Sequence, residues 1–96
     1  MEKVRSYTGL FIIAPEKLEA IDEVKRGIGA VIGDNSGKIL KDTMMGKKNL
    51  AYPIKKNNSG IYYEVIFSAM PKSMEKMRRM FNINTDVLRS LIDLSA

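Results

Sequence analysis

Residues 4–13, VRSYTGLFII, are apolar on both faces of an extended chain. Because side chains alternate along a strand, a run that is apolar on both sides is buried on both sides. This stretch therefore predicts a central strand of a sheet. Pro15 follows at once and suits the first turn of a helix, since its fixed φ is helical. The two faces are Tyr7, Gly9, Phe11 and Ile13 on one side, and Thr8, Leu10 and Ile12 on the other.

The same order of strand, proline and helix occurs a second time. Residues 61–69, IYYEVIFSA, alternate as a half-buried strand does, and Pro71 begins a shorter helix. Methionines line one face of that helix. Flexible thioether side chains fill irregular gaps in cores, so we expect a core surface here rather than a promiscuous binding surface. The residues on this face are Met74, Met77, Met80 and Phe81.

Residues 15–32 predict the first helix, because apolar residues recur at steps of three and four. Gly27 and Gly29 are unfavourable inside a helix. They predict either a close approach of this helix to the sheet or simply a weak final segment. The apolar stripe consists of Leu18, Ile21, Val24, Ile28 and Val31.

The rest of the chain completes a βαββαβ order. Residues 33–38 and 57–60 (NNSG) have the composition of loops, residues 38–45 form a weaker strand candidate, and residues 86–94 form the last strand. This order is that of the ferredoxin-like α+β fold, a four-stranded antiparallel sheet with two helices on one face. The other face has no helix of its own. We expect residues 1–96 to be a single domain.

The composition excludes most catalytic chemistry. The chain has no cysteine and no histidine, so it lacks thiolate metal ligands and every mechanism based on a histidine. Neither phosphate-loop pattern is present, and no spaced acidic cluster predicts a metal ion. We therefore expect no enzyme activity, no small-molecule substrate, no cofactor and no bound metal.

No apolar run is long enough for a membrane span, and residues 9–14 lack the flanks of a signal peptide. We therefore expect a cytoplasmic protein that does not enter membranes. The net charge of +5 suits an anionic partner, most simply nucleic acid, or merely a soluble basic surface. Tyrosines lie among the basic residues, but GIYYEVIF does not match the aromatic pattern of an RNA-recognition motif.

Residues 46–56, GKKNLAYPIKK, followed by Gly60-Ile61-Tyr62, form a long and unusual motif. The motif resembles the signature G-[RK]-[RK]-x-L-A-Y-P-I-x-K of the bacterial small-subunit (30S) ribosomal protein S6 family. Residues 5–7 resemble that family's N-terminal R-x-Y, and residues 84–91 resemble its last strand. Two positions depart from the family pattern: Thr8, where Glu is usual, and Met45, where Trp is common. Many relatives also extend beyond the last strand.

The resemblance implies the ferredoxin-like fold and a structural role in the small ribosomal subunit. Members of the family pair with ribosomal protein S18 and bind the central domain of the small-subunit ribosomal RNA, in support of assembly and translation. The resemblance thus implies that this protein is associated with the ribosome. The residues expected to bind RNA, or to support that contact, are Arg5, Tyr7, Lys47, Lys48, Lys55, Lys56 and Arg89. Those expected to bind the protein partner are Leu50, Ala51, Tyr52, Pro53 and Ile54.

Pro53 also bears on the position of this motif in the sheet. Proline has no N–H to donate, so residues 50–54 are expected at a sheet edge or in a loop. The residues alone are also compatible with two other functions. One is a regulatory or ligand-binding module that oligomerises through its sheet edges; the other is a small enzyme on the same fold, which the missing groups disfavour.

Overall fold

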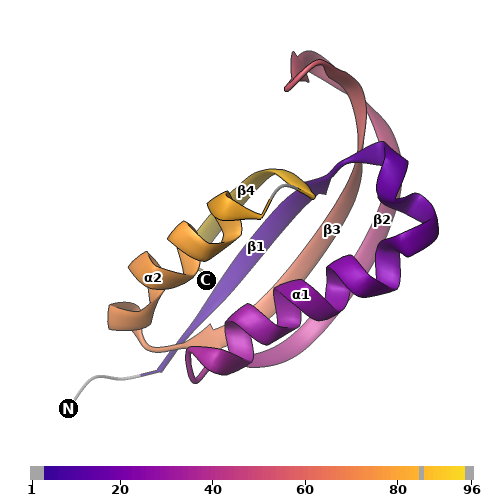
Figure 1. Cartoon of the computed structure of the whole chain (residues 1–96). Coiled ribbons are helices and arrows are strands. Elements are labelled where there is room, and N and C mark those ends of the chain that lie inside the picture. The colour runs from indigo at the N-terminus through magenta and orange to yellow at the C-terminus, as the bar shows by residue number, and fades with distance from the viewer. Residues whose placement is uncertain (1–3, 85, 95–96) are drawn as a thin grey trace.

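The computed structural model describes residues 4–84 and 86–94, which form one four-stranded antiparallel sheet and a helical layer (Figure 1). The strand order is β2-β3-β1-β4, as the ferredoxin-like fold requires. The expected single domain also includes residues 1–3, 85 and 95–96, which lie outside the described residues, as does Thr85 of the segment that resembles the family's last strand. The elements are β1 (Arg5–Ile13), the 3₁₀ helix η1 (Pro15–Ala20), α1 (Ile21–Asp34), β2 (Lys38–Ile54), β3 (Asn57–Ala69), α2 (Pro71–Ile83) and β4 (Val87–Leu94).

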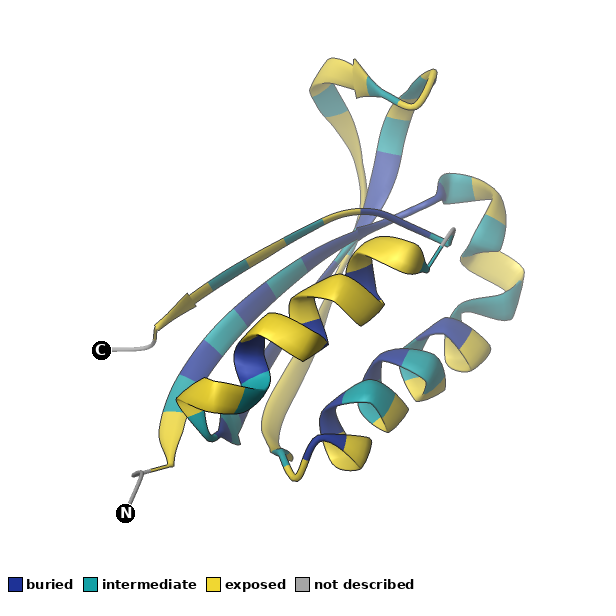
Figure 2. Cartoon of the chain, turned by 60° about the vertical axis from the view of Figure 1, so that its left-hand side comes forward, coloured by how far each residue is buried: buried dark blue, intermediate teal, exposed yellow. Residues whose placement is uncertain are grey.

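The central position predicted for residues 4–13 is confirmed. β1 pairs with β3 on one side and with β4 on the other, so Ile12 lies between Tyr62 and Arg89. Both helices cover the same face of the sheet (Figures 1 and 2). The main core fills the space between the two helices and the sheet. Its largest fully buried side chains are Phe11, Phe67, Phe81, Ile13, Ile28, Ile32, Ile61, Met77 and Val65.

The first helix differs from the prediction. Residues 15–20 form a separate 3₁₀ helix, and the backbone at Ala20 (φ −108°, ψ 25°) leaves helical values before α1 begins. A 3₁₀ helix has three residues per turn, so its apolar stripe does not continue that of the α-helix. Leu18 was therefore assigned wrongly to the core: its side chain is 53% exposed. Val24 and Ile28 are buried as predicted.

The methionine face of α2 is confirmed as core for Met74 and Met77, which are buried with Phe81. Met80 lies at its margin and is 37% exposed. Its sulfur is 3.9 Å from the amide nitrogen of Asn35, which also donates a 2.7 Å hydrogen bond to the Val31 carbonyl. The end of α1 thus contacts the edge of α2 through one asparagine.

The hairpin of β2 and β3 is longer than predicted. Residues 38–45 and the motif at 46–54 form one edge strand, and residues 57–60 belong to β3 rather than to a loop. The turn consists only of Lys55 (φ 49°) and Lys56 (φ 68°). Positive φ at both central residues defines a type I′ turn, which usually takes Asn-Gly. Two lysines give no such signal, and for this reason the loop was predicted at residues 57–60 instead of at Lys55 and Lys56.

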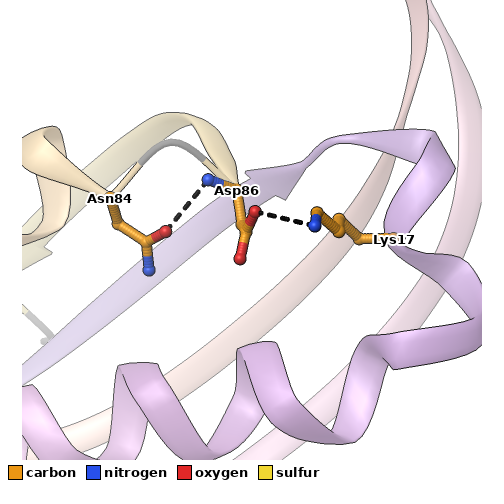
Figure 3. A network of polar contacts seen from close by, with 3 residues as sticks. All are labelled: Lys17, Asn84 and Asp86. Carbon is orange, nitrogen blue, oxygen red and sulfur yellow. Dashed lines mark hydrogen bonds and ion pairs between the residues drawn. The ribbon is translucent and has the colours of Figure 1, made fainter.

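A small polar network joins the two ends of the helical layer (Figure 3). The Lys17 ammonium lies 3.3 Å from the Asp86 carboxylate, and the Asp86 backbone N–H donates a 2.9 Å hydrogen bond to the Asn84 side-chain oxygen. The Asp86 carbonyl accepts a 2.9 Å hydrogen bond from the Ala14 N–H. These contacts fix the entry into β4 beside the exit from β1.

The glycines differ in what surrounds them. A Cβ at Gly27 would meet nothing within 4 Å, and one at Gly29 would make an ordinary 3.5 Å contact, so neither supports a close approach of α1 to the sheet. Gly60 is different: a Cβ there would lie 2.5 Å from the Ile12 Cγ2 atom. The close approach is therefore between β3 and the central strand.

We predict opposite effects of alanine at two of these glycines. Gly27→Ala should stabilise the fold by about 1 kcal/mol, because alanine is the better helix former and has free space. Gly60→Ala should destabilise it by roughly 1–3 kcal/mol, because the new methyl group overpacks against Ile12. Urea unfolding measures both. Equal effects at the two sites would contradict the contact with Ile12.

We also predict that Lys56→Gly stabilises the hairpin by about 1 kcal/mol, since an L-residue with positive φ costs roughly 1–2 kcal/mol and glycine does not. The matched control is Lys48→Gly, at a position without positive φ. Glycine in a strand costs roughly 0.5–1 kcal/mol, so this control should be less stable than the parent. The free energy of unfolding from urea melts decides between them; a loss at both positions would contradict the turn geometry.

Candidate functional site

The motif segment at the end of β2 packs onto the sheet face that carries no helix, here called the open face. Leu50 and Ile54 pack against a small cluster in which Ile12 is only 5% exposed. Tyr62 of β3 joins the same cluster. The hairpin end also projects beyond the rest of the sheet (Figures 1 and 2). The structure thus has a second, smaller core, here called the open-face cluster, in which Ile12, Ala14 and Leu88 are buried and the motif provides part of the cover.

Beside this cluster is a groove of about 350 Å³, here called the open-face groove. Residues of all four strands contribute to its walls. They are predominantly apolar, and Arg89 of β4 is the one charged residue among them. The lining residues are Leu10, Ile12, Leu50, Ala51, Tyr52, Pro53, Ile54, Tyr62, Arg89 and Leu91.

The five residues expected to bind a protein partner all line this groove, but they are not equivalent. Leu50 and Ile54 are half-buried on the protein's own cluster. Ala51 and Pro53 are exposed, and Tyr52 is 82% exposed. As expected from Pro53, the segment lies on an edge strand. The exposed part of this segment is therefore centred on Tyr52.

The two lysines at the start of the motif point to opposite sides of the sheet. Lys47 pairs with Ile61, which faces the main core, and directly opposed residues share a face. The Lys48 ammonium instead lies 5.6 Å from the centre of the Tyr62 ring, on the open face. Sequence reasoning treated the pair as one unit, whereas only Lys48 lies on the same face as the groove.

Lys55 and Lys56 are exposed at the hairpin tip. The Asn57 side-chain amide donates hydrogen bonds to the carbonyls of Lys55 (3.2 Å) and Ile54 (3.4 Å). This asparagine stabilises a turn whose two central residues are in an unfavourable conformation. The tip therefore presents two ammonium groups on a fixed backbone.

Arg5 and Tyr7 lie at the opposite end of β1. Seven residues separate Arg5 from Ile12, which is about 23 Å along a strand. The Tyr7 ring is buried and stacks on Phe67 with centroids 5.8 Å apart, so Tyr7 can support a contact but offers little surface of its own. Together with Arg78 of α2, which was not among the expected residues, these two line a hollow of about 340 Å³.

A second polar cluster lies on the helix-covered face. The Tyr63 hydroxyl donates a 2.8 Å hydrogen bond to the Asp42 carboxylate, and the Lys25 ammonium lies 3.9 Å from the same carboxylate. Burial, and then the bond to Asp42, raises the pKa of Tyr63 above its usual value. The Tyr63 phenol thus stays protonated at neutral pH, and the cluster ties β2 and β3 to α1.

Within residues 4–84 and 86–94, no group of three or more acidic side chains could hold a metal ion. No helix in this part of the chain is long and apolar enough to cross a membrane. What the described residues do offer is the open-face groove with basic groups around it. Sequence reasoning missed Leu10 and Leu91 as groove residues. The available signal was the apolar character of both faces of residues 4–13, together with a sheet face lacking a helix.

Comparisons with known proteins agree with this architecture. The sequence model of the family described as "Ribosomal protein S6" matches residues 6–92. Over 92 residues, 93% of this chain, the chain is 38% identical to the small ribosomal subunit protein bS6 of Helicobacter acinonychis and 32% identical to that of Phytoplasma mali. It spans 63% of the length of the Helicobacter protein and 96% of the Phytoplasma protein.

The crystal structure of 30S ribosomal protein S6 from Thermotoga maritima matches with a TM-score of 0.84 and 29% identity, covering 97% of this chain and 89% of that one. The solution structure of the C-terminal domain of the MgtC protein from Mycobacterium tuberculosis matches with a TM-score of 0.66 at 13% identity, covering 99% of this chain and 92% of that one. The second likeness is one of fold alone.

Proposed function

The chain belongs to the ribosomal protein S6 family, and from this premise we propose that it is a structural constituent of the small ribosomal subunit rather than an enzyme. It acts in the cytoplasm on the ribosome. There it binds the central domain of the small-subunit ribosomal RNA together with ribosomal protein S18, as a single domain. Its function is to supply a preformed surface on which RNA and partner assemble.

The observation that carries this proposal is the charge of the β2 strand and its turn. Residues 38–56 contain six lysines and one acidic residue, Asp42, a net charge of +5 that equals that of the whole chain. The strand lies at the sheet edge, where its lysines reach solvent. Clustered ammonium groups neutralise phosphates and release their counterions. This edge is therefore the surface best suited to a nucleic-acid backbone.

The open-face groove suits the protein partner. Its walls are apolar and include the exposed Tyr52 ring, and tyrosine is enriched in protein interfaces. An exposed edge strand beside an apolar groove is a hazard for aggregation unless it is charged or covered. The lysines provide the charge in the free protein, and S18 provides the cover in the complex.

For the RNA edge, we predict that Lys47→Ala and Lys48→Ala each lower the slope of log affinity against log salt by about 0.7 to 0.9, the value of one phosphate contact. The double variant should lose about twice as much, because the two side chains lie on opposite faces and act independently. Titration of an RNA junction fragment in the presence of S18, over a series of salt concentrations, measures the slopes.

The matched control is Lys76→Ala, which removes one positive charge from an exposed position of α2, the helix that packs on β4 at the opposite edge of the sheet from β2. Its slope should equal that of the parent protein. An unchanged slope in a lysine variant removes that lysine from the RNA contact, and an equal loss in all three variants would mean that only the overall net charge matters.

For the partner surface, we predict that Tyr52→Ala weakens binding to S18 while the free energy of unfolding stays within about 0.5 kcal/mol of the parent, because the side chain is exposed. Leu50→Ala is the matched comparison. It removes a side chain packed on the open-face cluster and should destabilise the chain itself. Isothermal titration and urea melts separate the two effects; parental S18 affinity in the Tyr52 variant would contradict the proposed surface.

A further inference from the structure

Arg89 is the one charged residue in the wall of the open-face groove. It lies opposite Ile12 of the central strand, whose side chain belongs to the open-face cluster. Within the described part of the chain, the Arg89 guanidinium makes no ion pair or side-chain hydrogen bond. Arg89 is exposed, so water reaches this fully ionised, five-donor group in the free protein, and the described part of its own chain supplies no acceptor.

Two acidic residues could share a face of the sheet with Arg89, but neither one pairs with it. Asp93 follows it by four residues on β4, about 13 Å along the strand. Glu64 pairs with Leu10, and so faces the same side, but two strands away from Arg89. Neither forms an ion pair with the guanidinium. Water serves the exposed guanidinium while the groove is open. Once the groove is covered, the acceptor must come from its occupant.

An apolar occupant alone would be unfavourable. Covering the guanidinium with aliphatic side chains would remove it from water without any hydrogen bond, and a buried unpaired charge is strongly destabilising. An occupant that carries a carboxylate beside an apolar side chain satisfies both parts of the groove. The planar fork of arginine matches a carboxylate with two parallel hydrogen bonds, a geometry that lysine cannot reproduce.

We propose that the open-face groove binds a segment of the protein partner in which a carboxylate pairs with Arg89 and a neighbouring apolar side chain lies against Leu50 and Ile54. This inference rests on the proposed function and deepens it. It also moves Arg89 from the residues expected to bind RNA to those that select the partner. Arg89 shares its depression with apolar side chains, whereas the lysines suited to phosphates lie along the β2 edge and turn.

The test compares Arg89→Met and Arg89→Lys in binding to purified S18 and, separately, to the RNA junction fragment. Hydrogen bonds to charged groups are worth roughly 1.5–3 kcal/mol, so Arg89→Met should weaken S18 binding by about 10- to 100-fold. Arg89→Lys should recover only part of this loss, because it keeps the charge without the fork. The salt slope of RNA binding should stay that of the parent. Urea melts check that both variants remain folded.

A rescue experiment then identifies the acceptor. Arg89→Glu is combined with S18 variants in which each Asp or Glu is changed in turn to Arg. One combination should restore affinity to within a few-fold of the parent pair, and that S18 residue is the acceptor. The proposal is overturned if no combination rescues binding, or if Arg89→Met keeps full S18 affinity and instead lowers the RNA salt slope by about one contact.

The outcome also separates this inference from the proposed function. If the parent protein binds neither S18 nor the RNA junction fragment, the proposed function fails and the inference fails with it. If the parent binds S18 and the Arg89→Met variant binds equally well, the inference alone is wrong. Sedimentation of the parent at the concentrations used shows whether a second copy of the chain occupies the groove instead, which would also overturn the proposal.

Discussion

The apolar character of the central strand β1 on both of its faces is the constraint on which the rest of the structure depends. Two helices cover one face, but no helix covers the other. The far end of the β2–β3 hairpin covers part of that second face, because Leu50 and Ile54 pack over Ile12. The cover extends over one end of the face only. The groove beside it exists because the protein's own chain leaves the other apolar positions on that face incompletely covered.

Much of the fold followed from short-range patterns in the sequence. Two-faced apolarity placed residues 4–13 at the centre, and prolines marked where η1 and α2 begin. The failures have local causes. Leu18 was misassigned because a 3₁₀ segment shifts the helical period, and residues 57–60 because Lys55-Lys56 turns without a recognisable turn sequence. The groove was harder to foresee, since it depends on how a hairpin bends over its own sheet.

Charge is distributed unevenly around this scaffold. Residues 15–34 carry five acidic and three basic side chains, whereas residues 38–56 carry one acidic and six basic side chains. The first segment forms helices beside the sheet, and the second forms its outer edge. The β2 edge therefore attracts a polyanion more strongly than α1 does. The second helix, residues 71–83, carries four basic side chains and one acidic side chain, and so offers a further attractive surface.

The close approach at Gly60 also constrains how sequences of this kind can diverge. A side chain at position 60 would occupy the space of the Ile12 methyl group, so neither position can change freely while the other is fixed. A smaller residue at position 12 would make room for alanine at position 60, and the two changes would be strongly non-additive. The contact thus couples the hairpin to the central strand sterically, through two positions that lie 48 residues apart in the chain.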